Sequence, residues 1–286
     1  MNLHRCTLIA LAATVAALAP AAARAGSAYD NCTGYIDFLP AVVNTQGTWC
    51  LKKDLTTPLA SGVAVTVTAA NVTLDCNDFK LVGVGGATQT LGIASAAGNL
   101  TVRRCQVRGF LHGTSLMGNY ATIEDNRFDN NREAGVWSDG EQHMIRRNLV
   151  TNSGGTPNGL YGYGVYLWGT GDVIDNTIVG VVNAENEGWS YGIEIADNHG
   201  GNVRGNRIRK LSAPDIGQGA AIHVGNASDG VVIEDNVMYL GPDDYFSGVK
   251  CDSLEAGMYR RNAVTGSNIY GAYDGCIDGG GNYSLP

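Results

Sequence analysis

The sequence predicts an all-β fold in which short parallel strands stack as the coils of a solenoid. Three observations predict it. An apolar-x-x-Asn-x-apolar segment and a Gly-Ile or Gly-Val strand alternate eight times from about residue 70 to the C-terminus. Successive Asn-type positions lie 21 to 30 residues apart, which is the spacing of solenoid repeats. Two or three short strands in each repeat leave no room for a helix. We therefore expect a single-domain parallel β-helix of about eight coils.

The first half of each repeat is a turn that carries an asparagine. Asparagine tolerates left-handed backbone conformations, and its amide bonds to neighbouring backbone groups. In coils stacked about 4.8 Å apart, the amides can also form a ladder. The positions in this slot are Asn77, Cys105, Asn126, Asn148, Asn176, Asn206, Asn236 and Asn262.

The chain before the first full repeat divides into two segments. Residues 1 to 25 have a short basic start, an apolar run and the sequence Ala23-Arg24-Ala25, which predicts a signal peptide cleaved after Ala25. Residues 26 to 70 lack the repeat, and solenoids need a cap over their first coil. We expect an N-terminal cap with a disulfide loop at 26–70 and the β-helix at 71–286.

Charge and hydropathy limit the partners. The chain has 19 Lys and Arg against 27 Asp and Glu, and removal of Arg5 and Arg24 with the signal lowers the net charge from −8 to about −10. An acidic surface argues against nucleic acid, and no other run approaches transmembrane length. We expect a soluble monomer that is secreted or periplasmic.

The cysteine count supports export. Without Cys6 in the signal, six cysteines remain, and they form three local pairs in the sequence. The predicted disulfides are Cys32–Cys50, Cys76–Cys105 and Cys251–Cys276. Metal binding by these cysteines is the alternative, but the chain lacks a C-x-x-C or Cys/His cluster.

Insertions in one turn of the solenoid indicate where a binding face lies. The segment from the Asn to the next Gly is 8 or 9 residues long in the second and third coils and 12 to 16 in the fourth to eighth. Such loops usually line the binding face. They bring together aromatic rings and carboxylates, the groups that bind sugars, although the rings can equally pack the loops onto the coils. These residues are Tyr161, Tyr163, Trp189, Tyr191, Tyr245 and Phe246 with Glu185, Glu187, Asp215, Asp243 and Asp244.

The Gly-Ile strands can be aligned in register. If Val136, Val165, Ile193, Ile222 and Val249 point inward, the following residues point outward on adjacent coils. This row is Trp137, Tyr166, Glu194, His223 and Lys250, and the next outward row is Asp139, Trp168, Ala196, Gly225 and Asp252.

The first row contains groups suited to catalysis. A carboxylate and a lysine beside an imidazole would orient it and tune its protonation. His223 or Tyr166 could move a proton, and Lys250 could neutralise a carboxylate or oxyanion. The alternative is a solvated sheet face with a favourable charge pattern. His112, His143 and His199 fall near turns and lack an equivalent row.

The segments TIEDNRF, YGIEIADN and AAIHVGN resemble the right-handed parallel β-helix superfamily of pectate lyases, polygalacturonases and related repeat proteins. The resemblance covers about residues 60 to 280. It implies a polysaccharide groove along the stacked outer sheet, where the row from Tyr166 to Lys250 lies. The N-T-D and G-H-G motifs of polygalacturonases and the D-P-H-D motif of alginate epimerases are missing. We predict no cofactor and no metal. Calcium is the alternative, but a convincing acidic cluster of the pectate lyase kind is missing too.

Three functions remain open. The first is a lyase that cleaves a uronic-acid-containing polysaccharide by β-elimination, with Arg207, Arg209, Lys210 and Lys250 as local positive charge. The second is a glycoside hydrolase that uses Glu194 with Asp243, Asp244 or Glu187. The third is a non-catalytic glycan-binding or structural solenoid. The predicted catalytic residues are His223, Lys250, Glu194 and Tyr166. The predicted substrate-binding residues are Trp137, Trp168, Tyr161, Tyr163, Trp189, Tyr191, Asp252, Asp244 and Tyr245.

Overall fold

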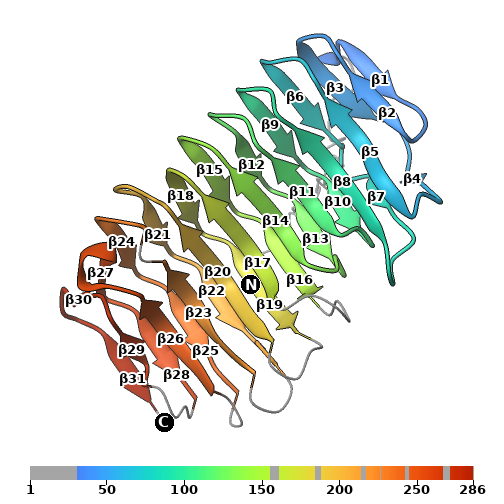
Figure 1. Ribbon diagram of the computed structural model, residues 1–286. Helices are drawn as coiled ribbons and strands as arrows, with labels where there is room; N and C mark the ends of the chain where they lie inside the picture. The colour runs from blue at the N-terminus through green and yellow to red at the C-terminus, as the bar shows by residue number, and fades with distance from the viewer. Residues whose placement is uncertain are drawn as a thin grey trace, which may run out of the picture.

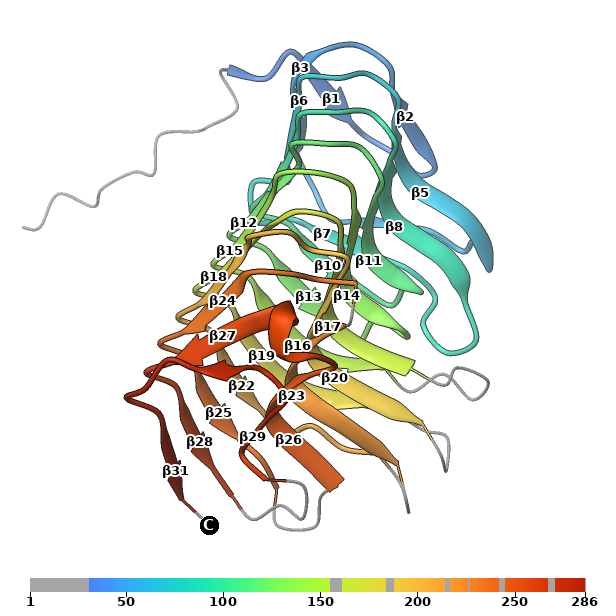
Figure 2. The same ribbon diagram turned by 60° about the vertical axis from the view of Figure 1, so that its left-hand side comes forward.

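The computed structural model describes residues 31–154, 161–183, 188–213, 217–225, 227–241, 245–266 and 271–285. Their strands form three parallel sheets, named here A, B and C, that run the length of the molecule (Figure 1). Seen from nearer its end, the solenoid has one sheet on each of three sides (Figure 2). The predicted fold class, an all-β single-domain parallel β-helix, is confirmed.

Sheet A has 11 strands: β1 (Gly34–Ile36), β3 (Gly47–Leu51), β6 (Val72–Asp75), β9 (Leu100–Arg103), β12 (Thr122–Glu124), β15 (His143–Arg146), β18 (Gly171–Ile174), β21 (Asn202–Arg204), β24 (Val231–Glu234), β27 (Gly257–Arg260) and β30 (Ile277–Asp278). Sheet B has 10 strands: β2 (Ala41–Val43), β5 (Ser61–Val67), β8 (Gln89–Ser95), β11 (His112–Leu116), β14 (Ala134–Asp139), β17 (Tyr161–Trp168), β20 (Trp189–Ala196), β23 (Gln218–Val224), β26 (Tyr245–Cys251) and β29 (Tyr273–Asp274). Sheet C has 10 strands: β4 (Leu55–Thr56), β7 (Lys80–Val82), β10 (Gln106–Arg108), β13 (Arg127–Asp129), β16 (Leu149–Gly154), β19 (Thr177–Val182), β22 (Arg207–Arg209), β25 (Val237–Tyr239), β28 (Ala263–Thr265) and β31 (Tyr283–Leu285). A short 3₁₀ turn, η2 (Leu254–Ala256), follows β26.

The segment at 26–70, expected to be a cap, also contributes strands to the solenoid within its described residues. Strand β3 pairs with β6, and β5 pairs with β8, both in parallel. The same three sheets therefore extend on the N-terminal side of residue 70. The predicted signal peptide lies outside the described residues.

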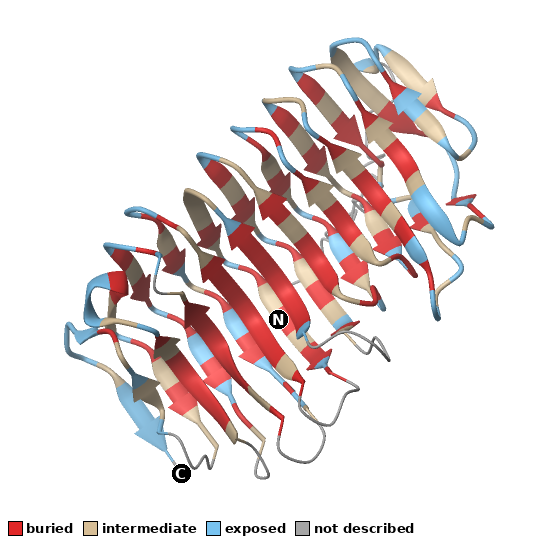
Figure 3. Cartoon of the chain, in the orientation of Figure 1, coloured by how far each residue is buried: buried red, intermediate tan, exposed pale blue. Residues whose placement is uncertain are grey.

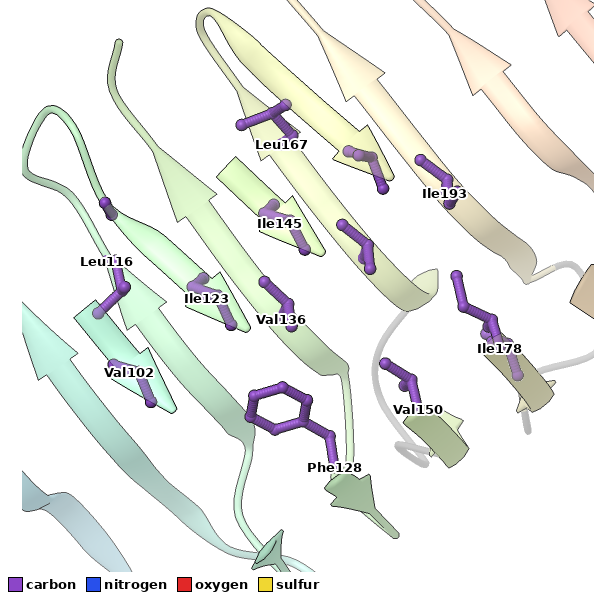
Figure 4. Packing of buried hydrophobic residues seen from close by; sticks show 14 of the residues in the cluster. Val102, Leu116, Ile123, Phe128, Val136, Ile145, Val150, Leu167, Ile178 and Ile193 are labelled. Atoms are coloured by element: carbon purple, nitrogen blue, oxygen red, sulfur yellow. The ribbon is translucent and has the colours of Figure 1, made fainter. Parts of the chain in front are cut away.

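The core is a column of aliphatic and aromatic side chains to which all three sheets contribute. Buried and more exposed positions alternate along most of the short strands of sheets A and C, whereas several strands of sheet B are buried along most of their length (Figure 3). Ile123 from sheet A, Val136 from sheet B and Phe128 from sheet C are fully buried and point into this column (Figure 4). Each coil stacks similar side chains on those of its neighbours, so the core is continuous.

The repeated glycine before each inward Val or Ile has a steric cause. A Cβ at Gly192 would lie 2.5 Å from the Ala221 carbonyl oxygen and 2.6 Å from Ile208 Cγ2. Gly164 meets the same obstruction from Gly192 and Ile178. At these two positions the core therefore has no room for a side chain, whereas Ala221 occupies the same corner of the next coil.

The predicted asparagine ladder is present and runs through Asn126, Asn148, Asn176, Asn206, Asn236, Asn262 and Asn282. Each side-chain amide from Asn126 to Asn262 donates to the Oδ1 of the next residue at 3.0–3.3 Å. The backbone expectation was wrong in one respect. The left-handed residue is the one before the ladder residue, for example Asp125 and Asp175 with φ 55°. From Asn126 to Asn262 the ladder residue itself is buried, and its amide bonds to the coils on either side, as Asn176 does to Ile145 and Asn206.

Asn77 does not belong to this ladder, contrary to the sequence alignment. It has φ 50°, and its amide donates to the Leu51 carbonyl at 3.1 Å. In the two coils before Asn126, this corner is closed instead by the disulfide Cys76–Cys105, with Cα atoms 4.7 Å apart.

The other two predicted disulfides are also formed. Cys32 and Cys50 have Cα atoms 5.9 Å apart, and Cys251 and Cys276 have Cα atoms 5.2 Å apart. Disulfides persist in oxidising compartments, which fits the predicted export. In the described part of the chain, no helix has the length and apolar character needed to cross a membrane.

Candidate functional site

The outward row predicted from the sequence is present on sheet B. Register pairs Trp137 with Tyr166, Tyr166 with Glu194, Glu194 with His223, and His223 with Lys250. Neighbouring strands are about 4.8 Å apart, so these five side chains form one line along the solenoid.

A carboxylate–imidazole–carboxylate group lies at the centre of the row. His223 Nδ1 is 2.7 Å from Glu194 Oε2, and His223 Nε2 is 3.0 Å from Asp252 Oδ1. Both ring nitrogens therefore face a carboxylate oxygen, and an imidazole can donate from both nitrogens only when it is protonated. The arrangement favours an imidazolium ion held between two carboxylates.

Burial and charge shift the pKa values of this group. Burial lowers the pKa of His223, but the hydrogen bonds and charges of Glu194 and Asp252 outweigh it, so the pKa of His223 is raised. Burial also raises the pKa of Glu194, an effect that the hydrogen bond with His223 opposes. Glu194 and His223 are only 8% and 7% exposed, although both lie on an outer face of the solenoid.

The burial comes from a second apolar cluster outside the main core. Tyr163, Tyr166 and Tyr191 are buried there with Ala134 and Ala220, and Trp137 and Trp189 pack against them. The outer strands β17, β20 and β23 are accordingly buried along most of their length (Figure 3). A sheet face that would otherwise be solvated is thus covered by its own aromatic rings.

The aromatic rings stack along the row. The Trp137 and Tyr166 rings have centroids 4.0 Å apart, and the Tyr191 and His223 rings have centroids 4.9 Å apart. Burial, with the Glu194 charge, raises the pKa of Tyr166 to about 12. Tyr166 therefore keeps its phenolic proton at neutral pH.

The position of Lys250 differs from the sequence prediction. Lys250 was expected to flank His223, but Asp252 occupies the Nε2 side of the ring. The Nζ atom of Lys250 is instead 5.4 Å from the centroid of the Trp189 ring. Asp252 follows Lys250 by two residues, so its carboxylate projects from the same face of the chain and reaches the imidazole.

The other predicted binding residues are spread around this centre. Tyr161 and Trp168, at the two ends of β17, are 42% and 48% exposed, and Tyr245 is half-buried at the start of β26. Phe246 is buried in the main core and is unavailable to a ligand. Asp244 lies outside the described residues, as do Glu185, Glu187, Asp215 and Asp243.

Sequence reasoning missed His112. Its ring is stacked on Trp137 with centroids 4.8 Å apart, and its Nε2 is 3.3 Å from Glu133 Oε2. It adds one more ring to the aromatic stack, from the coil before Trp137. Strand register pairs His112 with Ala134 and Ser115 with Trp137, so the alignment of the strands gives no signal of this ring contact.

A hollow on the same face extends the site toward the N-terminus. The row continues from Trp137 through Ser115 and Ala94 to Thr66. These small side chains, with Leu91 and Met117, line a hollow of about 440 Å³. Along the solenoid axis, the outer face of sheet B thus carries the hollow, then the aromatic rings, and then the charged group of Glu194, His223 and Asp252.

The basic residues expected near the site lie elsewhere. Arg207 and Arg209 are on β22 of sheet C, and Lys210 follows them, whereas Lys250 is on sheet B. Because β22 belongs to sheet C, Arg207 and Arg209 lie on a different side of the solenoid from Lys250. Among the described residues, no group of three His, Cys, Asp or Glu side chains is arranged to hold a metal ion.

Comparisons with known proteins agree with this architecture. Residues 51–180 match the family model described as a right handed beta helix region. Comparison with curated protein sequences gives no significant match.

Three solved structures illustrate the similarity. The Dettilon tailspike protein is 13% identical with a TM-score of 0.54, over 88% of this chain and 60% of that one. The Azotobacter vinelandii mannuronan C-5 epimerase AlgE6 A-module is 12% identical with a TM-score of 0.43, over 90% and 92%. An alginate lyase from Paenibacillus is 12% identical with a TM-score of 0.36, over 86% and 98%. At 13% identity the similarity to the tailspike protein concerns the fold alone, and the TM-scores of the other two structures are below 0.5.

Proposed function

Because the chain is a right-handed parallel β-helix protein, we propose that it is an exported polysaccharide-active protein whose substrate lies along the outer face of sheet B. We propose further that it is a lyase that cleaves a uronic-acid-containing chain by β-elimination. The observation that carries this proposal is the row of Tyr166, Glu194, His223 and Lys250, with His223 between two carboxylates.

The general base in this proposal is His223. Glu194 holds the Nδ1–H, which directs the Nε2 lone pair of a neutral ring outward. In the free protein, Asp252 is hydrogen-bonded to Nε2, and the Asp252 side chain is 37% exposed. A bound sugar would displace Asp252 and expose Nε2 to the proton at C5 of the uronate.

The remaining steps assign one role to each neighbour in the row. The ammonium group of Lys250 pairs with the uronate carboxylate and stabilises the charge that develops as the C5 proton leaves. The bond from C4 to the glycosidic oxygen breaks, a C4–C5 double bond forms, and the leaving oxygen takes the phenolic proton of Tyr166. Because the pKa of Tyr166 is raised to about 12, the phenol is protonated at neutral pH, so it can donate this proton and cannot act as the base.

The aromatic segment and the hollow supply binding in this scheme. The rings of Trp137 and Trp168 offer apolar faces for sugar rings. The hollow near Ala94 lies four strands from Glu194 in the same row, or about 19 Å away. A chain of several sugars fits this length better than a single sugar.

The test is to incubate the folded protein with uronate-containing and neutral polysaccharides. Ultraviolet absorbance of the unsaturated product and the release of reducing ends are followed together. We expect both signals to rise on a uronate polymer and to be lost in His223→Gln. His199→Gln is the matched control, because His199 bonds Asp229 at 2.8 Å in the exposed turn between β20 and β21, outside the row of His223.

A glycoside hydrolase is the second candidate. Two carboxylates in different environments favour it: Glu194, whose pKa is raised by burial, and the more exposed Asp252. Release of reducing ends without ultraviolet absorbance would favour this hydrolase over the lyase. Silence in both measurements, across a broad panel, would favour a non-catalytic glycan-binding or structural solenoid.

A further inference from the structure

Sheet C presents cations on its outer face although the protein as a whole is acidic. Two outward rows cross this sheet. One row contains Lys80, Arg127 and Arg207, and the other contains Arg108 and Arg209. The inward residues between them, such as Ile208, are buried in the core. We call these five cations with Lys210 the basic face.

The two arginines of β22 lack carboxylate partners in the described part of the chain. Across the sheet, Arg207 faces Thr177 and Val237, while Arg209 faces Val179 and Tyr239. The carboxylate in these rows is that of Asp129, three strands away from Arg209, or about 14 Å. That distance exceeds the Debye length of about 8 Å at physiological salt, so Asp129 does not neutralise this pair.

The other end of the basic face is different. Lys80 lies 3.5 Å from Asp54, and Arg108 lies 3.9 Å from Asp129. The side chains of Lys80, Asp54 and Arg108 are about half exposed and that of Asp129 is 21% exposed, so both pairs lie at the surface, where ion pairs contribute little to stability. Among the described residues, the cations of the basic face without an ion pair are therefore Arg127, Arg207, Arg209 and Lys210, and three of these four lie together at β22.

An exposed ring adjoins these charges. Tyr239 is 52% exposed and is the cross-strand neighbour of Arg209. A guanidinium group binds a carboxylate or sulfate through two parallel hydrogen bonds, and a neighbouring ring can stack on a sugar. A charged ring sugar satisfies both groups, whereas a lipid headgroup would leave the ring without a stacking partner.

We propose that the basic face is a second, non-catalytic binding site for an anionic polysaccharide, which lies along the solenoid axis on sheet C. Sheets B and C are different sides of the solenoid (Figure 2). A chain held on sheet C therefore leaves the outer face of sheet B open, and two sites on one molecule raise the effective concentration of a long polymer. This inference does not depend on cleavage at His223.

The test measures binding of polygalacturonate, dextran sulfate and neutral dextran by affinity electrophoresis at low and high salt. We expect binding of the charged polymers, weakened by salt, and at least about tenfold weaker binding by the double variant R207Q/R209Q. The matched control is K52Q/K53Q, which removes two exposed charges near Tyr35 and should bind as the parent chain does. All variants are checked for an unchanged melting temperature.

The His223→Gln variant separates this site from the proposed lyase. It should keep polyanion binding even where it has lost cleavage. Loss of binding in His223→Gln with retention in R207Q/R209Q would overturn the inference and place the polyanion on sheet B. Binding to vesicles of anionic phospholipid, but to neither charged polysaccharide, would also overturn it. Preference between polygalacturonate and dextran sulfate would identify the anion as carboxylate or sulfate and would support the inference.

Discussion

Replacing Asn176 by alanine tests the contribution of the buried ladder. The Asn176 side chain is 1% exposed and takes part in four hydrogen bonds. Its amide donates to the Ile145 carbonyl at 2.9 Å and to Asn206 Oδ1 at 3.1 Å. Its Oδ1 accepts from the backbone N–H of Asn148 at 2.9 Å and from the amide of Asn148 at 3.0 Å. The partner groups on Asn148, Ile145 and Asn206 are themselves buried, so shortening the side chain leaves them without their protein partner.

The expected loss is about 4 kcal/mol, at roughly 1 kcal/mol of net stability for each hydrogen bond. That is a large fraction of the roughly 5 to 15 kcal/mol that stabilises a typical domain. The free energy of unfolding is measured by urea denaturation followed by circular dichroism. Asn119→Ala is the control, because Asn119 is exposed and accepts one bond from Glu141 N–H at 3.1 Å. A loss below about 1 kcal/mol for Asn176→Ala, or equal losses for both variants, would refute the reasoning.

Three further predictions concern acid stability, catalysis and core packing. Burial lowers the pKa of His143 from 6.5 to about 4. The unfolded chain therefore takes up this proton first, and stability falls by about 3 kcal/mol as the pH drops from 6.5 to 4. Urea denaturation at both values should show this loss in the parent chain and a smaller one in His143→Gln; equal losses would contradict it. The raised pKa of His223 means that its neutral form appears only at higher pH, so lyase activity should rise with pH. Glu194→Gln should lower the rate and move that rise to lower pH in a pH–rate profile, and an unmoved rise would exclude the proposed pairing. Gly192→Ala should lower the free energy of unfolding by about 1–3 kcal/mol, because its Cβ would overlap the core. Gly225→Ala is the control for that change, since a Cβ there meets its nearest atom at 3.6 Å.

The periodic features of the molecule could be predicted from the sequence. A repeat that recurs every 21 to 30 residues can bury its apolar side chains only by stacking, so the solenoid follows from the spacing. The alignment of the glycines also set the register of sheet B. It placed Glu194, His223 and Lys250 on one line, as the strand pairing confirms. The cysteine pairs were predictable because neighbouring coils bring residues 18 to 29 positions apart into contact.

Only the tertiary structure decided which neighbours in that register make contact. Lys250 is the register partner of His223, yet Asp252, two residues further along, is the residue that bonds the imidazole. The length and direction of the side chain, and not the strand register, therefore select the partner. The low exposure of Glu194 arises from aromatic rings contributed by several coils, which one strand does not reveal. The disulfide Cys76–Cys105 closes the corner where the ladder would continue. The number of residues in this turn differs locally, so Asn77 lies outside the ladder and bonds the Leu51 carbonyl instead.

The tertiary structure also determines on which side of the solenoid a residue lies. Arg207 and Arg209 follow the ladder turn by only a few residues, yet they belong to sheet C and not to the face that carries Lys250. A repeat in the sequence determines that three faces exist and which residues alternate in and out. The angle of each corner is set by the packing of its neighbours, and that packing determines which outward residues share a face.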